Sequence, residues 1–94
     1  DMVSTPEINI PAPDDKKFQI VDEFIKNSVF KDAKIIHIDG IRVEFEKGWG
    51  LLRASNTSPV LVLRFEAEND KELEKIKDIF YTSLKNIEPN TIKF

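Results

Sequence analysis

The short run from Arg53 to Pro59, RASNTSP, is dense in groups that donate hydrogen bonds. The planar guanidinium of Arg53 can bind two oxygens of one phosphate at once. Three hydroxyls and the amide of Asn56 stand between Arg53 and Pro59, and the backbone N–H groups of such a loop can curl into an anion-binding nest. These are the groups that bind a phosphate when no metal ion neutralises its charge.

The same residue types are also common in ordinary turns. Ser, Asn and Thr side chains bond to nearby backbone groups, and Pro59 fixes its own φ and favours an extended conformation at Ser58. An arginine near the end of a strand is commonly just solvated. Residue types and spacing therefore leave two interpretations open, an anion site and a structural connection.

Other candidates for chemistry are weaker. His37 is the only histidine and the chain has no cysteine, so neither a metal site nor a disulfide is expected. The pair Asp14–Asp15 is typical of a helix cap, and Glu66 and Glu68 are typical of strand-end charges rather than of an acid–base pair. Trp49, between two glycines, is compatible with packing or with facing a ligand, and we favour packing.

Composition sets the class of protein. The 94 residues are 40% hydrophobic and 33% charged, which suits one globular domain. The net charge of −3 argues against a nucleic-acid binder, which normally has a basic face. No apolar stretch approaches the roughly 18 residues that span a bilayer, and no signal-like start is present. We therefore expect a cytoplasmic location and no membrane partner.

Two segments have apolar residues spaced by three and four, which predicts amphipathic helices. The first begins after Asp14 or Asp15 as the expected N-cap and ends near Asn27. Its apolar stripe consists of Phe18, Ile20, Val21, Phe24 and Ile25. The second helix begins at Asn69, with Glu72 in the position of a capping box. Its stripe consists of Leu73, Ile76, Ile79, Phe80 and Leu84.

Alternating and β-branched runs predict the strands, which we expect at residues 7–10, 34–38, 41–45, 49–54 and 60–67. The pairs Asp39-Gly40 and Lys47-Gly48 predict tight turns between neighbouring strands. Two helices that each need an apolar surface favour a single sheet beneath them. We therefore predict an α+β two-layer sandwich: an antiparallel sheet of four to five strands with two helices on one face, in the order β-α-β-β-β(-β)-α.

A family resemblance covers nearly the whole chain. Residues 39–77 contain the combination GWG…RASNT…PVLVLRFEA, and residues 4–10 read STPEINI. Both resemble the C-terminal domain (domain 4) of the α-D-phosphohexomutases, closest to the bacterial phosphomannomutase/phosphoglucomutase branch. The resemblance implies a TATA-binding-protein-like fold. It also implies that residues 1–94 form a single phosphosugar phosphate-binding domain of a larger multidomain mutase.

The resemblance also assigns a role to the loop. It implies that the loop holds the phosphate that is not being transferred, through Arg53, Ala54, Ser55, Asn56 and Thr57. The parent enzyme would interconvert hexose 1-phosphate and hexose 6-phosphate, of mannose or glucose, through a bisphosphorylated intermediate, using Mg²⁺ and a phosphoserine. The family's serine, metal and sugar-binding patterns, T-A-S-H-N-P, D-G-D-x-D-R and G-E-x-S-G, do not occur here. We therefore expect no catalytic residue and no metal site in this chain, and no mutase activity from it alone.

Two alternatives to this interpretation stay open. Relatives that act on glucosamine phosphate resemble R-P-S-G-T at the loop, so Ala54 and Asn56 favour the mannose and glucose enzymes. The same domain of a phosphoglucosamine or phosphopentose mutase is nevertheless one alternative. The other is a non-catalytic binding or regulatory module, since small α+β sandwiches carry many functions.

Overall fold

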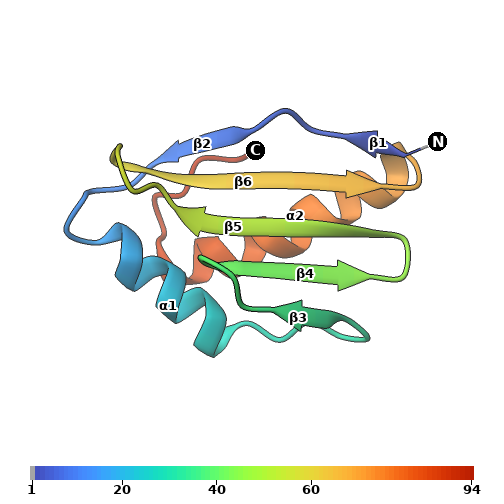
Figure 1. The fold of residues 1–94 in the computed structure, drawn as a ribbon, viewed down its shortest axis with the longest axis horizontal. Helices are drawn as coiled ribbons and strands as arrows, with labels where there is room; N and C mark the ends of the chain where they lie inside the picture. The colour runs from blue at the N-terminus through green and yellow to red at the C-terminus, as the bar shows by residue number, and fades with distance from the viewer. Residues whose placement is uncertain (1) are drawn as a thin grey trace.

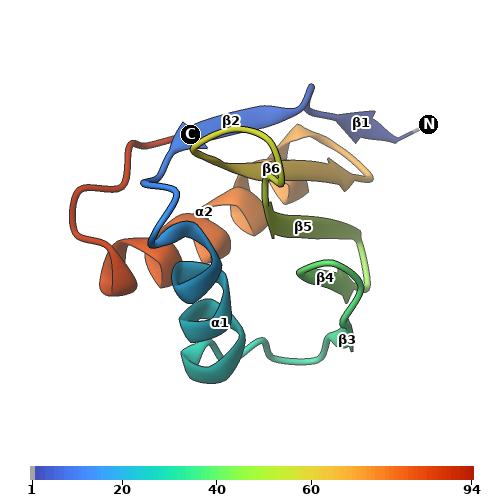
Figure 2. The ribbon, with the colours of Figure 1, turned by 60° about the vertical axis from the view of Figure 1, so that its left-hand side comes forward.

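The computed structural model describes residues 2–94, in which two helices pack on one face of an antiparallel sheet (Figure 1, Figure 2). Asp1, part of the predicted domain 1–94, lies outside the described residues. The strands are β1 (Val3–Ser4), β2 (Ile8–Pro11), β3 (Lys34–Ile36), β4 (Ile41–Phe45), β5 (Gly48–Ala54) and β6 (Val60–Ala67). The helices are α1 (Lys17–Asn27) and α2 (Asp70–Ile87). The predicted α+β two-layer sandwich is confirmed.

The sheet has the order β1-β6-β5-β4-β3, and β2 also pairs with β6. β1 and β2 lie end to end along one edge of β6, because Val3 pairs with Ala67 while Ile10 pairs with Leu61. The described residues thus form six strands, one more than the upper limit predicted. A two-residue strand shows no period in the sequence, and β1 exists only because β6 offers it an edge.

Aromatic rings fill the centre of the core between the sheet and the helices. Phe80 of α2 is fully buried. Its ring lies 5.3 Å from that of Phe24 in α1 and 5.1 Å from that of Phe65 in β6, the latter edge to face. Such tilted and edge-to-face pairs are the favoured aromatic geometries. One ring therefore joins both helices to the sheet.

The glycines on either side of Trp49 face this core. A Cβ atom on Gly50 would stand 2.6 Å from Cε1 of Phe80 and 3.0 Å from Cδ1 of Phe65. Trp49 lies on the opposite face of β5, where its Nε1–H donates to Glu66 Oε1 at 2.9 Å and the guanidinium of Arg42 lies 4.1 Å from its ring. Trp49 thus has partners within the protein, in agreement with the packing role that we favoured.

The start of α1 differs from the prediction. Neither Asp14 nor Asp15 is the N-cap: that position is Lys16, which makes no side-chain capping bond. The carbonyl of Pro13 instead accepts the backbone N–H groups of Lys16 and Lys17, both at 2.9 Å. Phe18, predicted in the apolar stripe, is 53% exposed, because the buried face is rotated toward the preceding residue. That face consists of Lys17, Ile20, Val21 and Phe24.

The second helix agrees with its prediction. Asn69 is the N-cap of α2, and its Oδ1 accepts a hydrogen bond from the N–H of Glu72 at 2.9 Å. Ile79 is only half-buried. The rest of the predicted stripe is buried, namely Leu73, Ile76, Phe80 and Leu84. A local cap and a continuous stripe were sufficient to place this helix.

The close approach of Phe80 to Gly50 gives a test of the fold. We expect Gly50→Ala to lower the stability by about 1–3 kcal/mol, the usual cost of overpacking a core. For a domain of this size that corresponds to a fall in melting temperature of roughly 5–20 °C, measurable by circular dichroism. The double variant Gly50→Ala/Phe80→Leu should lose less than the sum of its single changes, because the smaller side chain makes room. Unchanged melting of Gly50→Ala would contradict this packing.

Candidate functional site

The candidate loop lies at one end of the sheet, where β5 passes into β6. Arg53 and Ala54 are the last residues of β5, and residues 55–59 form the connection. The N-terminal part of α1 and the loop between β3 and β4 lie at the same end of the sheet (Figure 1). The connection is also fixed from outside, because the N–H of Ala12 donates to the carbonyl of Pro59 at 2.9 Å. Three parts of the chain thus meet around the candidate site.

Ser55 organises the interior of this loop. It is only 8% exposed, and its Oγ accepts the backbone N–H groups of Thr57 at 3.2 Å and of Ser58 at 3.1 Å. A hydroxyl has two acceptor sites and one proton, so the Ser55 O–H is still able to donate. The N–H groups of Thr57 and Ser58, however, are directed into the loop. They do not form the outward-facing nest that the sequence suggested as one possibility.

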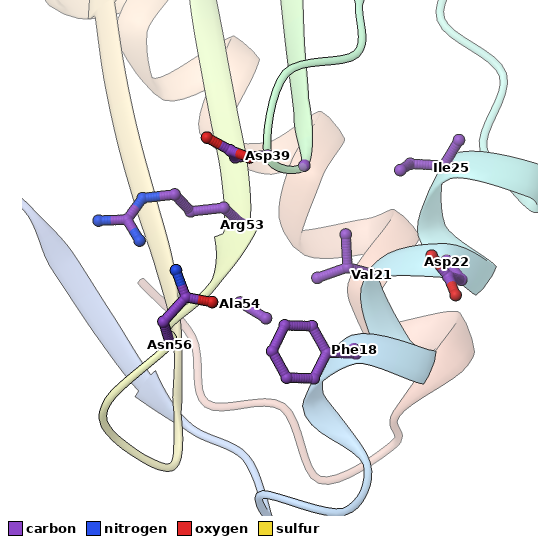
Figure 3. Close-up of a pocket in the computed structure, with 9 residues that line it drawn as sticks. Phe18, Val21, Asp22, Ile25, Asp39, Arg53, Ala54 and Asn56 are labelled. Carbon is purple, nitrogen blue, oxygen red and sulfur yellow. The ribbon is translucent and has the colours of Figure 1, made fainter.

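Arg53 presents its guanidinium on the solvent side of the loop. The residue is half-buried, and within residues 2–94 it takes part in no ion pair. In Figure 3 the guanidinium and the side-chain amide of Asn56 lie on the same side of the pocket. An unpaired guanidinium next to an amide donor is a suitable arrangement for an oxyanion.

A pocket of about 310 Å³ opens beside these groups. Arg53, Ala54 and Asn56 line it, so the structure brings together three of the five predicted residues. Ser55 is buried beneath the loop, and Thr57 is exposed next to Asn56 without lining this pocket.

The other walls of the pocket come from residues that the sequence analysis did not associate with the loop. α1 contributes Phe18 and Asp22, and the β3–β4 loop contributes Asp39 and Gly40. Figure 3 shows the guanidinium of Arg53 directed away from α1 and Asp22. The carboxylate of Asp22 disfavours an anion in the part of the pocket near α1, whereas Asp39 lies on the same side of the pocket as Arg53 (Figure 3).

Gly40 allows the β3–β4 loop to reach β5. Its φ is +137°, and a Cβ atom there would lie 2.3 Å from the carbonyl oxygen of Leu52 and 2.8 Å from the Cβ of Arg53. Only glycine combines that backbone conformation with so close an approach. The Asp39-Gly40 pair predicted a turn from the sequence, but its contact with Arg53 depends on the packing of distant segments.

The described residues offer no arrangement suited to a metal ion. Across residues 2–94, no three His, Cys, Asp or Glu side chains gather closely enough to ligate one, and His37 is exposed. In the same residues, neither helix has the length and apolar character needed to cross a membrane. The polar groups at this site are the guanidinium of Arg53, the amide of Asn56 and the carboxylates of Asp22 and Asp39.

Comparison with known proteins identifies relatives of this chain. A sequence profile described as phosphoglucomutase/phosphomannomutase, C-terminal domain, matches residues 7–83. The phosphomannomutase/phosphoglucomutase of Pseudomonas putida is 54% identical over 87 residues, which are 93% of this chain and 19% of that protein. The phosphoglucomutase of Neisseria meningitidis serogroup B is 47% identical over 92 residues, 96% of this chain and 20% of that protein.

A solved structure agrees with these sequence relatives. A phosphoglucomutase/phosphomannomutase family protein from Burkholderia thailandensis superimposes with a TM-score of 0.86 at 40% identity, covering 100% of this chain and 20% of the other. The chain spans about a fifth of the length of the relatives that it matches. With a matched profile over most of its length, the chain belongs to the phosphoglucomutase/phosphomannomutase C-terminal domain family.

Proposed function

We propose that this chain is the phosphate-binding domain of a phosphomannomutase/phosphoglucomutase. The parent enzyme would interconvert hexose 1-phosphate and hexose 6-phosphate through a bisphosphorylated sugar, and this domain would hold the phosphate that is not transferred. The observation that supports the proposal most directly is the guanidinium of Arg53, which forms no ion pair within residues 2–94 and lies beside Asn56. The family to which the chain belongs also includes enzymes of this class.

Each loop residue has a distinct part in this proposal. Arg53 binds two phosphate oxygens through its fork of N–H groups, and Asn56 donates from its amide. Ser55 donates its O–H while accepting the loop's own N–H groups, and exposed Thr57 donates its hydroxyl when the ligand covers it. Ala54 keeps this part of the pocket narrow with a methyl group. A hydrogen bond to a charged group contributes roughly 1.5–3 kcal/mol, so a few of them suffice to anchor one phosphate.

The proposed mechanism is one of positioning. A bisphosphorylated intermediate has a phosphate at each end, so the domain must bind either one while chemistry takes place at the other. A site made of a guanidinium, an amide and hydroxyls binds phosphate oxygens. Its affinity does not depend on which carbon of the sugar carries the phosphate. Closure of such a domain over the sugar would also exclude water from the reaction.

Other parts of the parent enzyme would supply the chemistry. The family implies Mg²⁺ and a phosphoserine, and residues 2–94 provide no carboxylate cluster for a metal. We therefore assign no step of this domain's role to magnesium. The partners of the domain are hexose phosphates and the remaining domains of a cytoplasmic enzyme.

The choice of sugar is part of the proposal. Ala54 and Asn56 differ from the R-P-S-G-T pattern of enzymes for glucosamine phosphate, which favours mannose and glucose phosphates. The alternatives are the same domain of a phosphoglucosamine or phosphopentose mutase, and a non-catalytic binding module. A panel of sugar phosphates tested on the full-length protein separates all three, because a binding module turns over none of them.

The first test concerns Arg53. Titration of the 94-residue chain with mannose 6-phosphate, followed by amide NMR, should shift residues 53–57 with a dissociation constant around 1 mM, about −4 kcal/mol. Arg53→Ala should abolish the shifts. Arg64→Ala is the matched control, because Arg64 is exposed on the neighbouring strand β6 and its loss changes the net charge equally. Equal weakening in both variants would mean that general charge, not this site, attracts the ligand.

A second test uses turnover. In the full-length protein, Arg53→Ala should raise KM for hexose 1-phosphate by roughly tenfold or more, in line with the loss of a charged hydrogen bond. The 94-residue chain alone should show no mutase activity. Unchanged kinetics in Arg53→Ala would contradict the assigned role, and turnover by the isolated chain would contradict its purely positioning nature.

A third test concerns the interior of the loop. Ser55→Ala removes the acceptor for the N–H groups of Thr57 and Ser58. We expect faster amide hydrogen exchange at these two residues, a stability loss of about 1 kcal/mol, and weaker phosphate binding than in the Thr57→Val variant. The exchange of α2 amides serves as the internal control. If Thr57 and Ser58 keep their protection, Ser55 does not organise the loop.

A further inference from the structure

Lys17 occupies a position that its residue type does not explain. It begins the buried face of α1, followed by Ile20, Val21 and Phe24 at the spacing of an apolar stripe. Lys17 is only 5% exposed, and it and Ser55 are the two buried polar or charged residues of the described chain. Lysine is among the residues least often buried, because its ammonium loses water that protein groups must replace.

One of the groups that replace this water belongs to the loop between β5 and β6. The Nζ of Lys17 donates to the carbonyl of Ser58 at 2.9 Å, across 41 residues of sequence. It also forms an ion pair with Oδ1 of Asp14 at 2.9 Å, one turn earlier, and the Asp14 side chain is 71% exposed. The ammonium is therefore neutralised on its solvent side and bonded to the loop on its inner side.

Ser58 is consequently held on both sides. Its N–H donates to Oγ of Ser55 at 3.1 Å, and its carbonyl accepts from Lys17 at 2.9 Å and from the N–H of Val60 at 2.8 Å. The two buried polar side chains of the described residues thus bind the same residue, at the end of the loop opposite Arg53. Asn56 and Thr57 lie between these fixed points.

We propose that Lys17 is a positioning residue for phosphate binding, which fixes the far end of the loop so that Asn56 and Thr57 face the ligand bound by Arg53. This inference rests on the proposed function. Lys17 does not touch the phosphate: its ammonium is bonded to Ser58 and Asp14, and it does not line the pocket beside Arg53. Its effect passes through the backbone of residues 56–58.

Stability alone does not account for a lysine here. A buried ammonium carries a large desolvation penalty, whereas a methionine would carry none and would continue the apolar stripe of α1. The cost of burying the ammonium is offset by its bonds to the Ser58 carbonyl and to Asp14, and by the Phe18 ring, whose centroid lies 5.3 Å from Nζ. A role in fixing the loop explains why the charge points inward, toward residue 58.

The test compares Lys17→Met with Lys16→Met in the 94-residue chain. Both remove one positive charge, but Lys16 is exposed and forms no bond to the loop. With mannose 6-phosphate as the ligand, Lys17→Met should weaken binding by about tenfold, as expected for the loss of a loop-fixing hydrogen bond. Lys16→Met should stay within about twofold of the starting protein. Amide exchange at Thr57 and Ser58 should accelerate in Lys17→Met alone, with the melting temperature little changed.

Each outcome has a defined meaning. Equal binding by the starting protein and Lys17→Met overturns the inference, and so does equal weakening in both variants, which would indicate a general effect of charge. If the starting protein binds no hexose phosphate, the proposed function fails, and loop exchange still decides whether Lys17 fixes Ser58.

A measurement on the unsubstituted chain covers the case in which Lys17→Met does not fold. ¹⁵N NMR of the lysine ammonium groups should show slowly exchanging protons for Lys17, with a coupling across the hydrogen bond to the Ser58 carbonyl, and none for Lys16. The Lys17 signal should shift on addition of mannose 6-phosphate. A rapidly exchanging Lys17 ammonium would overturn the proposal.

Discussion

The register between β5 and β6 is the constraint on which the candidate site depends. The pairing runs from Gly48 opposite Ala67 to Ala54 opposite Leu61, and it places Arg53 opposite Val62. A slip of one residue would turn every side chain of β5 to the other face. Arg53 would then point into the core, and Trp49 would stand where Gly50 now meets Phe80. Since only glycine fits beneath α2 at that point, the helix fixes the register and the register exposes the guanidinium.

The loop after β5 is built by the whole sandwich rather than by its own residues. Ala12 donates to Pro59, Lys17 donates to Ser58, and Gly40 lies against Arg53. These contacts come from the segment after β2, from α1 and from the β3–β4 loop, which are far apart in the sequence. A loop of turn residues would otherwise sample many conformations, at an entropic cost of about 1–2 kcal/mol for each residue that the ligand must order. Fixing it beforehand reduces that cost.

The sequence correctly predicted those features of the fold that depend on a pattern of neighbouring residues. β6 (Val60–Ala67) and the Asn69 cap of α2 were placed correctly because alternation, spacing and capping act within a few residues. β1 and the exposure of Phe18 were not, since each depends on packing elsewhere in the fold. The N-cap of α1 was also missed, because the backbone carbonyl of Pro13 takes the place of a capping side chain. For the site, residue types left both an anion site and a plain turn open. The family resemblance favoured the former, and the burial of Lys17 could not be foreseen from a stripe position that usually holds an apolar residue.

Electrostatics limits what the candidate site can do alone. The chain has a net charge of −3, and Asp22 and Asp39 line the same pocket as Arg53, so the surrounding field opposes an anion. Attraction must come from short-range donors, whose strength falls steeply with distance and with poor alignment. Such a site binds weakly when open and more strongly once water is excluded and the effective dielectric falls. The proposed role would require this behaviour, because strong attraction from a basic surface would hold a phosphate even when the site is open to water.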